Sequence, residues 1–266
     1  MVIDLGLEPL AEARDLLAAA IQAQASCVGL WQEWGELRWW QSGLPAMAAN
    51  LVLDCGAQPN CSQLRALAQL LSRAPSPAGW LLWPDQQPNL QQSVLRGCGF
   101  RLCERLWLGV MDSPQLAGIT ARWPAVSSSC RLLSSREREP LARLYGACHQ
   151  VPPSLAQVAA RAFLGDPDQF STYGYFLADA HATVLEPVAA ITTCRRSSLG
   201  SLLWLGTHPA YRCRGYARQV TLAACHGLIQ QGVGRVHVQA SEAAVPLYSS
   251  LGFSHGGWLE LWGCDA

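Results

Sequence analysis

The chain has 266 residues, of which half are hydrophobic and 14% are charged, and its 19 basic and 19 acidic residues give a net charge of zero. This length suits one large domain or two domains of about 120–150 residues, and the hydrophobic content excludes a disordered chain. Because surfaces that bind nucleic acid are broadly basic, the balanced charge argues against nucleic acid as the main partner.

The N-terminal segment, residues 1–5, lacks the basic start and the long apolar core of a signal peptide. No apolar run reaches the roughly 18 residues that a membrane-spanning helix needs. We therefore expect a cytoplasmic protein without a membrane partner.

The 11 cysteines are scattered among apolar neighbours, and no two of them form a C-x-x-C motif. This pattern predicts free, buried thiols. The dipeptides Cys148-His149 and Cys225-His226 raise the alternative of a zinc site, but adjacent residues rarely point at one metal. We therefore expect no bound metal.

The first half of the chain is predicted to alternate helices and strands. Its first helix covers 8–26, where Leu10, Leu16, Leu17 and Ile21 recur near the helical period. The elements that follow in chain order are a strand at 50–54, a helix at 62–72, a strand at 79–83, a helix at 89–96 and, after Gly99-Phe100, a strand that ends at 111.

The segment 112–129 contains two prolines and a run of serines, a composition that predicts a loop. We assign the linker between two domains to residues 116–129. The domains are then predicted to cover 1–115 and 130–266.

The second half is predicted to begin with a strand and two helices and to continue mainly as strands. Its helices are expected at 136–149, 154–164, 214–231 and 241–251. Its strands are expected at 130–133, 172–178, 187–195, 201–206 and 235–239, with a final strand after Gly252-Phe253.

A shift of 153 residues aligns "VLRGCGF" at 94–100 with "LYSSLGF" at 247–253. In both segments a Gly-Phe pair follows a predicted helix and precedes a predicted strand. A similar shift brings 51–53 close to 203–205. We interpret the halves as two copies of one α/β unit. The alternative is two unrelated α/β domains that share a common helix–glycine–strand corner.

Between a predicted strand and a predicted helix lies the segment "THPAYRCRGYA", which ends at Ala217. A helix N-terminus leaves N–H groups unpaired and carries partial positive charge, so phosphate binds there when no side chain blocks the backbone. Gly215 allows close approach, Ala217 is small, and Arg212 and Arg214 add positive charge. The segment predicts a phosphate-binding loop. A nucleotide-binding domain is an alternative, but the chain lacks both a Gly-rich dinucleotide motif and a Gly-Lys-Ser/Thr loop.

From about Cys130 to the C-terminus, these motifs resemble the GNAT superfamily of acyl-CoA-dependent N-acyltransferases. The family's loop, Arg/Gln-x-x-Gly-x-Gly/Ala, is matched by Arg212, Gly215 and Ala217, and its Leu-Tyr-x-x-Leu-Gly-Phe motif is matched at 247–253. The first half, through "WLLWPDQQPNLQQSVLRGCGF", looks like the degenerate N-terminal domain of tandem GNAT proteins. The resemblance implies an α/β (α+β) fold of two tandem GNAT-like domains, each a mixed, mostly antiparallel sheet flanked by helices.

The resemblance also implies a site for acetyl-CoA as co-substrate. The strand end would pair its backbone with the pantetheine arm, the loop would wrap the pyrophosphate, and Tyr248 would protonate the departing thiolate. In two places the chain departs from the family: Cys213 replaces a common glycine, and Ser241 replaces an asparagine that often contacts the cofactor. The residues implied to bind the cofactor are Leu205, Gly206, Thr207, Arg212, Cys213, Arg214, Gly215, Tyr216, Ala217 and Ser241.

The activity implied is transfer of an acetyl group from acetyl-CoA to a primary amine of a small molecule or peptide. Members often carry a carboxylate base on the strand before the loop, but residues 201–204 contain none. Glu186 and His208 are the candidates for the base that deprotonates the amine, and the alternative is that both are solvated surface residues. The missing carboxylate favours a second interpretation of the chain, a non-catalytic acyl-CoA-binding or interaction protein.

Tyr248 has an alternative role as a packing residue, because Leu247 and Leu251 beside it are expected to face the core. The first half has no Arg-x-x-Gly-x-Gly/Ala loop, and the repeat places Leu95 where Tyr248 stands. Leucine cannot donate a proton, so the first half is expected to be non-catalytic.

Overall fold

The computed structural model describes residues 7–54, 56, 60–86, 88–123, 127–177 and 186–265. The chain divides into two compact units, and each unit is built from segments that are not continuous in the sequence. The first unit comprises the residues up to Gly109 together with 239–245 and 255–266, and the second comprises 110–238 and 246–254. The predicted domains at 1–115 and 130–266 are continuous segments, so this division differs from them.

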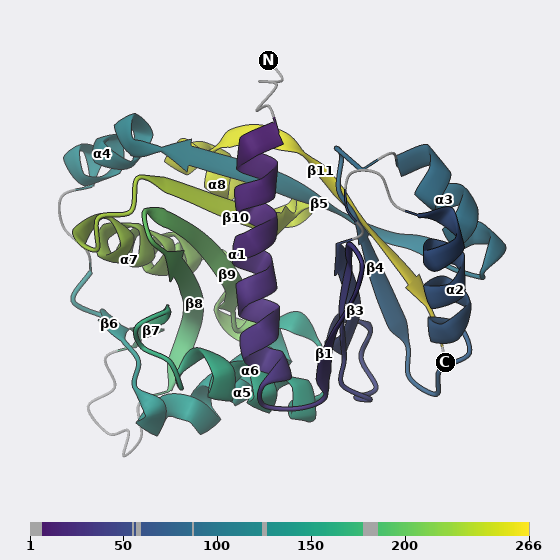
Figure 1. Cartoon of the computed structure of the whole chain (residues 1–266). Helices are drawn as coiled ribbons and strands as arrows, with labels where there is room; N and C mark the ends of the chain where they lie inside the picture. The colour runs from purple at the N-terminus through teal and green to yellow at the C-terminus, as the bar shows by residue number, and fades with distance from the viewer. Residues whose placement is uncertain are drawn as a thin grey trace. The chain divides into compact units, whose positions relative to one another are not determined.

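The first unit contains a sheet with strand order β1-β2-β3-β4-β11-β5. Neighbouring strands are antiparallel from β1 to β3 and between β4 and β11, whereas β3 and β4 are parallel. Figure 1 shows β11, in yellow at the end of the chain, beside β4, with Trp262 opposite Trp80. The strands are β1 (Leu30–Trp34), β2 (Leu37–Gln41), β3 (Asn50–Asp54), β4 (Ala78–Leu82), β5 (Arg101–Asp112) and β11 (Ser254–Cys264).

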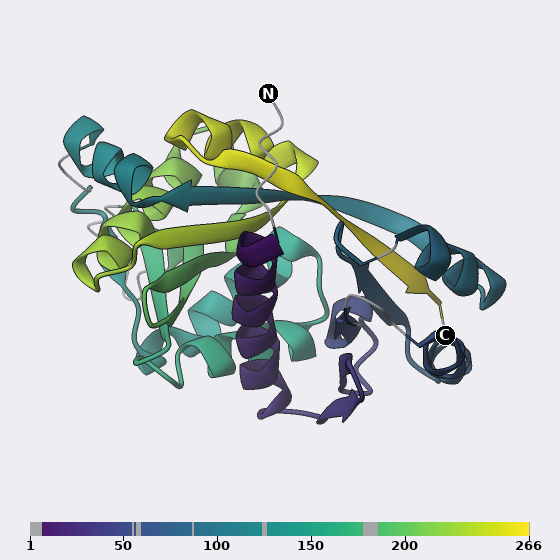
Figure 2. The ribbon, with the colours of Figure 1, turned by 45° about the horizontal axis from the view of Figure 1, so that its top comes forward.

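The helices of the first unit cover both faces of its sheet. The helices are α1 (Leu7–Ala25), α2 (Cys61–Leu71) and α3 (Pro88–Gly97). Figure 2 shows α2 and α3 side by side, and they share a buried cluster with Trp80, Phe100, Trp262 and Cys264. The rings of Trp80 and Phe100 meet edge to face with centroids 6.2 Å apart. Strand β11 therefore contributes side chains to the core of the first unit.

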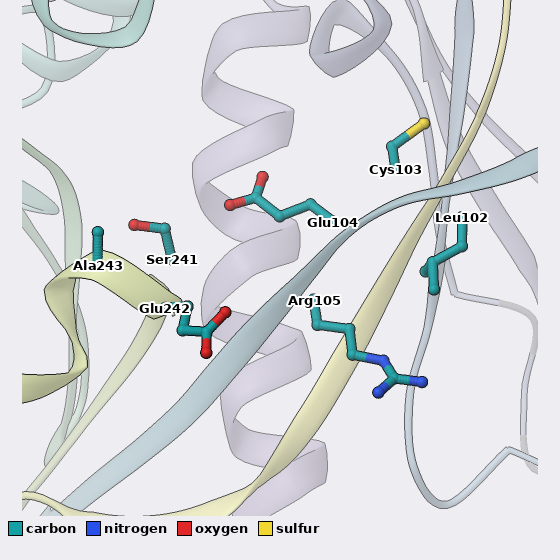
Figure 3. A pocket seen from close by; sticks show the side chains of 7 residues that line it. All are labelled: Leu102, Cys103, Glu104, Arg105, Ser241, Glu242 and Ala243. Carbon is teal, nitrogen blue, oxygen red and sulfur yellow. The ribbon is translucent and has the colours of Figure 1, made fainter.

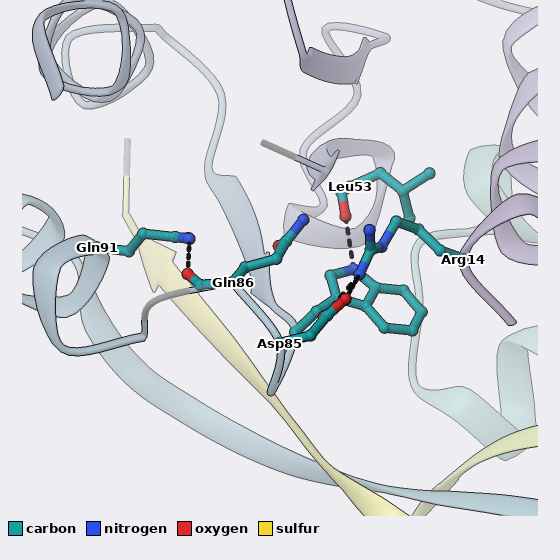
Figure 4. A network of polar contacts seen from close by, with 6 residues as sticks. Arg14, Leu53, Asp85, Gln86 and Gln91 are labelled. Carbon is teal, nitrogen blue, oxygen red and sulfur yellow. Dashed lines mark hydrogen bonds and ion pairs between the residues drawn. The ribbon is translucent and has the colours of Figure 1, made fainter. Parts of the chain in front are cut away.

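Helix α1 is tied to the end of β4 by a polar network that Figure 4 shows. Arg14 Nη2 donates hydrogen bonds of 2.7 Å to both carboxylate oxygens of Asp85, and its guanidinium lies 5.0 Å from the ring centroid of Trp83. The indole N–H of Trp83 donates to the carbonyl of Leu53 at 2.8 Å. Because successive strand residues point to opposite faces, Trp83 lies on the α1 side and Trp80 does not.

One hairpin of the first unit and one helix of the second were not predicted from the sequence. The hairpin β1–β2 was missed because β1 is an edge strand exposed on both faces, so its residues show no alternation. Helix α4 (Ser113–Arg122) occupies much of the predicted linker 116–129. Its Pro114 stands in the first helical turn, where a missing N–H is harmless, so this proline begins a helix and does not mark a loop. Residues 124–126 of that linker lie outside the described part.

The second unit contains a sheet with strand order β10-β9-β8-β7-β6. Its strands pair antiparallel except for β9 and β10, which are parallel. The strands are β6 (Cys130–Leu132), β7 (Phe170–Phe176), β8 (Pro187–Arg196), β9 (Leu199–Thr207) and β10 (Arg235–Ser241). The helices besides α4 are α5 (Arg138–His149), α6 (Pro153–Phe163), α7 (Tyr216–Gln230) and α8 (Val245–Leu251). Most of these ranges lie within a few residues of the predicted ones, and Ala178, expected to end a strand, lies outside the described residues.

In the second unit, α5 and α7 cover opposite faces of the sheet. On one face the Tyr145 hydroxyl of α5 lies 2.6 Å from Thr192 Oγ1, which lies 2.8 Å from Thr172 Oγ1. Tyr173, the residue after Thr172, points to the other face. Its hydroxyl occupies the place that a Cβ at Gly227 of α7 would take. The predicted fold class, mostly antiparallel sheets flanked by helices, is confirmed. Among the described residues, no helix is long and apolar enough to cross a membrane.

Candidate active site

Strand β9 has one paired edge and one edge that is largely open. It pairs with β8 from Leu199 to Thr207 but with β10 only from Leu199 to Leu202. Among the described residues of the second unit, no strand pairs with the second edge of β9 beyond Leu202. An unpaired strand edge presents backbone N–H and C=O groups to any extended ligand. The predicted contact residues Leu205, Gly206 and Thr207 all lie on this open stretch.

A β-bulge interrupts β9 at the start of the open stretch. Leu203 opposes Thr192 and Gly206 opposes Ala190, so Trp204 and Leu205 together oppose one residue of β8. Trp204 has a φ of 51°, a left-handed conformation that non-glycine residues adopt at a cost of about 1–3 kcal/mol. Bulges re-aim backbone groups and recur beside active sites. The segment "SLLWLGT" carries no sequence signal for this feature.

The side chain of Trp204 is held in a ring cluster beneath α5 and α6. Its ring centroid lies 5.0 Å from those of Tyr145 and His149 and 6.1 Å from that of Phe163. This packing stabilises the left-handed backbone of the bulge.

The loop after β9 turns through a short 3₁₀ helix, η3 (Pro209–Tyr211), before α7 begins. His208 caps η3, because its Nδ1 accepts a hydrogen bond of 3.3 Å from the backbone N–H of Ala210. Cys213 has a φ of 61° and is exposed. The cysteine therefore adopts a conformation that glycine takes without strain, which explains why a glycine is common there.

Gly215 is the N-cap of α7 and leaves its N-terminus open. It has a φ of 82°, and no heavy atom among the described residues lies within 4 Å of the position of a Cβ. No side chain caps the helix. Tyr216 and Ala217 in its first turn are half-buried, while Arg212 and Arg214 are exposed. Free N–H groups, open space and nearby positive charge together form an anion-binding site.

The two arginines differ in their surroundings. The guanidinium of Arg212 donates to the carbonyl of Thr207 at 3.3 Å and to that of Cys148 at 3.5 Å, which links the loop to α5. The guanidinium of Arg214 lies 5.6 Å from the ring centroid of Tyr211. Arg214 is therefore the arginine that a phosphate could recruit without breaking a backbone contact.

Comparisons with known proteins identify the fold. A family model described as "FR47-like protein" matches residues 182–262. A GCN5-related N-acetyltransferase from Kribbella flavida is 15% identical with a TM-score of 0.68, and the match covers 96% of each chain. A tandem GNAT protein from the clavulanic acid biosynthesis pathway is 13% identical with a TM-score of 0.61, over 100% of this chain and 97% of that one. The chain has the GNAT fold. No curated protein matches the sequence.

In GNAT terms, Tyr248 is the residue expected to act as general acid, and it lies on α8. Its side chain is 3% exposed, and its ring meets that of Phe253 edge to face at 5.4 Å. Burial raises the pKa of Tyr248, as does the nearby Cys225 thiol. The phenol is therefore protonated across the neutral range. A proton donor and a packing residue both fit these observations, so the acid role stays a prediction.

Ser241 falls in the first unit, and its contact with the cofactor stays a prediction. It lines a cavity of about 710 Å³ that Figure 3 shows. Burial raises the pKa of Glu104 in this cavity, and Arg105 forms an ion pair of 3.3 Å with Glu260. The lining residues are Leu102, Cys103, Glu104, Arg105, Ser241, Glu242 and Ala243.

The two candidate bases, Glu186 and His208, both interact with other groups of the protein. Glu186 forms an ion pair of 2.6 Å with Arg143, and both side chains are more than half exposed. His208 uses Nδ1 to cap η3. Their roles as bases stay untested. Among the described residues, no group of three or more His, Cys, Asp or Glu side chains could hold a metal ion, and every described cysteine is a free thiol.

Proposed function

We propose that the second unit is an acetyl-CoA-dependent N-acetyltransferase that acetylates a primary amine of a small molecule or peptide. The observation that carries this proposal is the open edge of β9 leading directly into the open N-terminus of α7 at Gly215. Acetyl-CoA has both an extended amide-containing arm and a pyrophosphate. A strand edge suits the first and a helix N-terminus suits the second.

The pyrophosphate would lie at the first turn of α7. Gly215 provides room for close approach, and the N–H groups of Tyr216 and Ala217 are among those that helical bonding leaves free. Arg214, which has no backbone contact to break within the described part of the chain, would add a charge-assisted hydrogen bond. The side chain of Cys213 is exposed. It therefore leaves more room for the pyrophosphate in this loop than a side chain buried in the loop would.

The thioester would lie along β9 past the bulge, with backbone N–H groups near Leu205–Thr207 stabilising the oxyanion of the tetrahedral intermediate. Tyr248 would then give its proton to the leaving thiolate. General acid catalysis of this kind is worth about 100- to 10,000-fold in rate. Binding amine and thioester together supplies a further part of the acceleration.

A non-catalytic acyl-CoA-binding protein is the second candidate. Residues 201–204 of β9 contain no carboxylate, and Glu186 is paired with Arg143. Such a protein would use the same loop and strand edge, so binding alone does not separate the two candidates.

The test is release of free thiol from acetyl-CoA in the presence of a panel of primary amines, covering polyamines, amino sugars, amino acids and peptide N-termini. We expect at least one amine to accelerate thiol release above the rate without acceptor, and mass spectrometry to show a product heavier by one acetyl group. Binding of acetyl-CoA without transfer to any amine would favour the second candidate. An absence of binding would contradict both.

A further inference from the structure

His149, the last residue of α5, lies against the open stretch of β9. Its ring meets that of Trp204 edge to face with centroids 5.0 Å apart. A Cβ added at Gly206 would stand 3.4 Å from His149 Nε2 and 2.7 Å from Cys148 Cβ. The absence of a side chain at Gly206 is thus what allows the end of α5 to reach the strand where the thioester is proposed to lie.

His149 Nε2 is buried and has no hydrogen-bond partner among the described residues. Leaving a buried polar group unpaired costs about 1–3 kcal/mol, so this nitrogen beside Gly206 calls for a ligand that pairs with it. The hydroxyl of Tyr145, in the same ring cluster, is already bonded to Thr192 at 2.6 Å.

His149 stands on one of the two faces of the sheet from which an amine can reach the carbonyl carbon. A thioester that continues the sheet along β9 has its carbonyl plane near the plane of the sheet. Nucleophiles approach a carbonyl carbon from above or below that plane. Helix α7 covers one face of this sheet and α5 the other, and His149 is on the α5 side. A base for such an attack would lie on a helix that covers the sheet and not on the strand itself. This agrees with the absence of a carboxylate from residues 201–204 of β9.

The surroundings keep the imidazole neutral. Burial lowers the pKa of His149 below its usual range, and the charge of Arg212 lowers it further, while the backbone of Trp204 acts in the opposite direction. The other titratable groups that face the ring are Tyr145 and Cys148, and burial raises the pKa of each. Both are therefore uncharged at neutral pH, and the ring can accept a proton there.

We propose that His149 is the general base that deprotonates the acceptor amine; this inference rests on the proposed acetyltransferase function. The acceptor enters as an ammonium and gives one proton to His149 Nε2. The neutral amine forms the C–N bond to the acetyl carbon, and the C–S bond breaks. The thiolate takes a proton from Tyr248, which regains one from the amide nitrogen through water. His149 finally releases its proton to solvent, so one proton is produced per acetyl group transferred.

The experiment compares His149→Gln with the parent protein, using acetyl-CoA and an acceptor from the amine panel. Glutamine keeps a polar side chain of similar size but cannot accept the proton. We expect kcat to fall about 100-fold or more while the thermal shift given by coenzyme A is retained. The parent's kcat/KM should fall as the pH drops through the pKa of His149, because the protonated ring cannot act as a base, and this acid limb should be absent in the variant.

His226→Gln is the matched control, because His226 lies on α7 and bonds the carbonyl of Trp123 at 2.9 Å, which glutamine can also do. It should keep kcat within about threefold. If His149→Gln is too unstable to assay, His149→Ala is measured with added imidazole, which should restore part of the lost rate.

Two results would overturn the assignment. A His149→Gln variant that keeps kcat within about threefold and retains the acid limb would show that another group is the base, and loss of activity in His208→Gln would identify it. A parent protein that binds acetyl-CoA but transfers to no amine would instead remove the proposed function, and with it the role of His149.

Discussion

The helix that follows β3 in the first unit and the helix that follows β9 in the second begin in different ways. At the start of α2, the side chain of Asn60 accepts hydrogen bonds of 2.9 and 3.3 Å from the backbone N–H groups of Ser62 and Gln63. At the start of α7, Gly215 has no side chain to offer, and the N–H groups stay open. The same strand–helix connection can thus be closed by its own capping residue or left available to an anion.

The two helix–glycine–strand corners share a backbone hydrogen bond, and they differ at the buried position four residues before the glycine. Phe100 N–H donates to the carbonyl of Leu95 at 3.0 Å, and 153 residues later Phe253 N–H donates to that of Tyr248 at 3.1 Å. Gly99 and Gly252 both have positive φ. Leu95 and Tyr248 therefore occupy equivalent, buried positions. This equivalence supports the interpretation of a repeat, in which only the second copy carries a proton donor at this place.

Tyr248→Phe should give the largest effect, because it removes the hydroxyl that is proposed to protonate the thiolate, at the position where the first corner has Leu95. We expect kcat to fall about 100- to 10,000-fold while the affinity for coenzyme A and the thermal midpoint change little, since the ring still packs on Phe253. In the parent protein, loss of rate from ionisation of Tyr248 should begin only above a pH of about 10, because burial raises its pKa. Steady-state kinetics measured as a function of pH gives both the fall in kcat of the variant and the pH at which the parent protein begins to lose rate. A variant with kcat within threefold of the parent would make Tyr248 a packing residue, as Leu95 is.

Trp262→Ala should destabilise the first unit and spare the second. Trp262 lies in the first unit's core although it comes from the end of the sequence, and truncating a buried tryptophan costs about 3–5 kcal/mol. Denaturant unfolding should show the loss, while coenzyme A should still raise the thermal midpoint of the part that remains folded. Equal loss of stability and of coenzyme A binding would mean that the units do not behave separately.

Gly215→Asp should close the open helix N-terminus. A side chain and a negative charge would both meet the pyrophosphate, so the stabilisation of about 2.7 kcal/mol expected at a hundredfold excess over the dissociation constant should disappear. Gly232→Asp is the control, because Gly232 also has positive φ, 78°, and open space at its Cβ position, but follows the other end of α7. A coenzyme A shift that survives Gly215→Asp and not Gly232→Asp would place the phosphates elsewhere.

Asn60→Ala should give the smallest effect. Loss of the cap leaves the N–H groups of Ser62 and Gln63 without their acceptor and should lower the free energy of unfolding by about 1 kcal/mol. Titration calorimetry should find one coenzyme A per chain both before and after the change, because α2 lacks the arginines that precede α7. A stoichiometry of two in the parent protein would contradict the view that the first copy has lost its site.

Features that depend on neighbouring residues could be predicted from the sequence. Most helices and strands of the second unit follow from local periodicity, and the fold class was implied by the resemblance that two local motifs carry. The role of the loop from Arg212 to Ala217 stays a prediction. The hairpin β1–β2 was missed because its exposed edge strand shows no alternation of apolar and polar residues. Helix α4 was taken for a linker because Pro114 was read as a helix breaker, but proline breaks a helix only in its interior and Pro114 lies in the first turn. The bulge at Trp204 and the approach of His149 to Gly206 depend on elements packed from elsewhere in the chain. No local pattern records them, and the roles of the site residues stay predictions.

The place of β11 has a consequence for how the chain folds during its synthesis. The edge of β4 that β11 covers is made early, but its partner residues, such as Leu261 opposite Leu81, are made about 180 residues later. At synthesis rates of about 5–20 residues per second, this apolar strand waits roughly 10–40 s for its neighbour. Until then the nascent first unit exposes a sheet edge that can pair with other chains. We therefore expect ribosome-bound fragments that stop before β11 to bind chaperones and to aggregate on release, even when α7 and the strands before it have already folded.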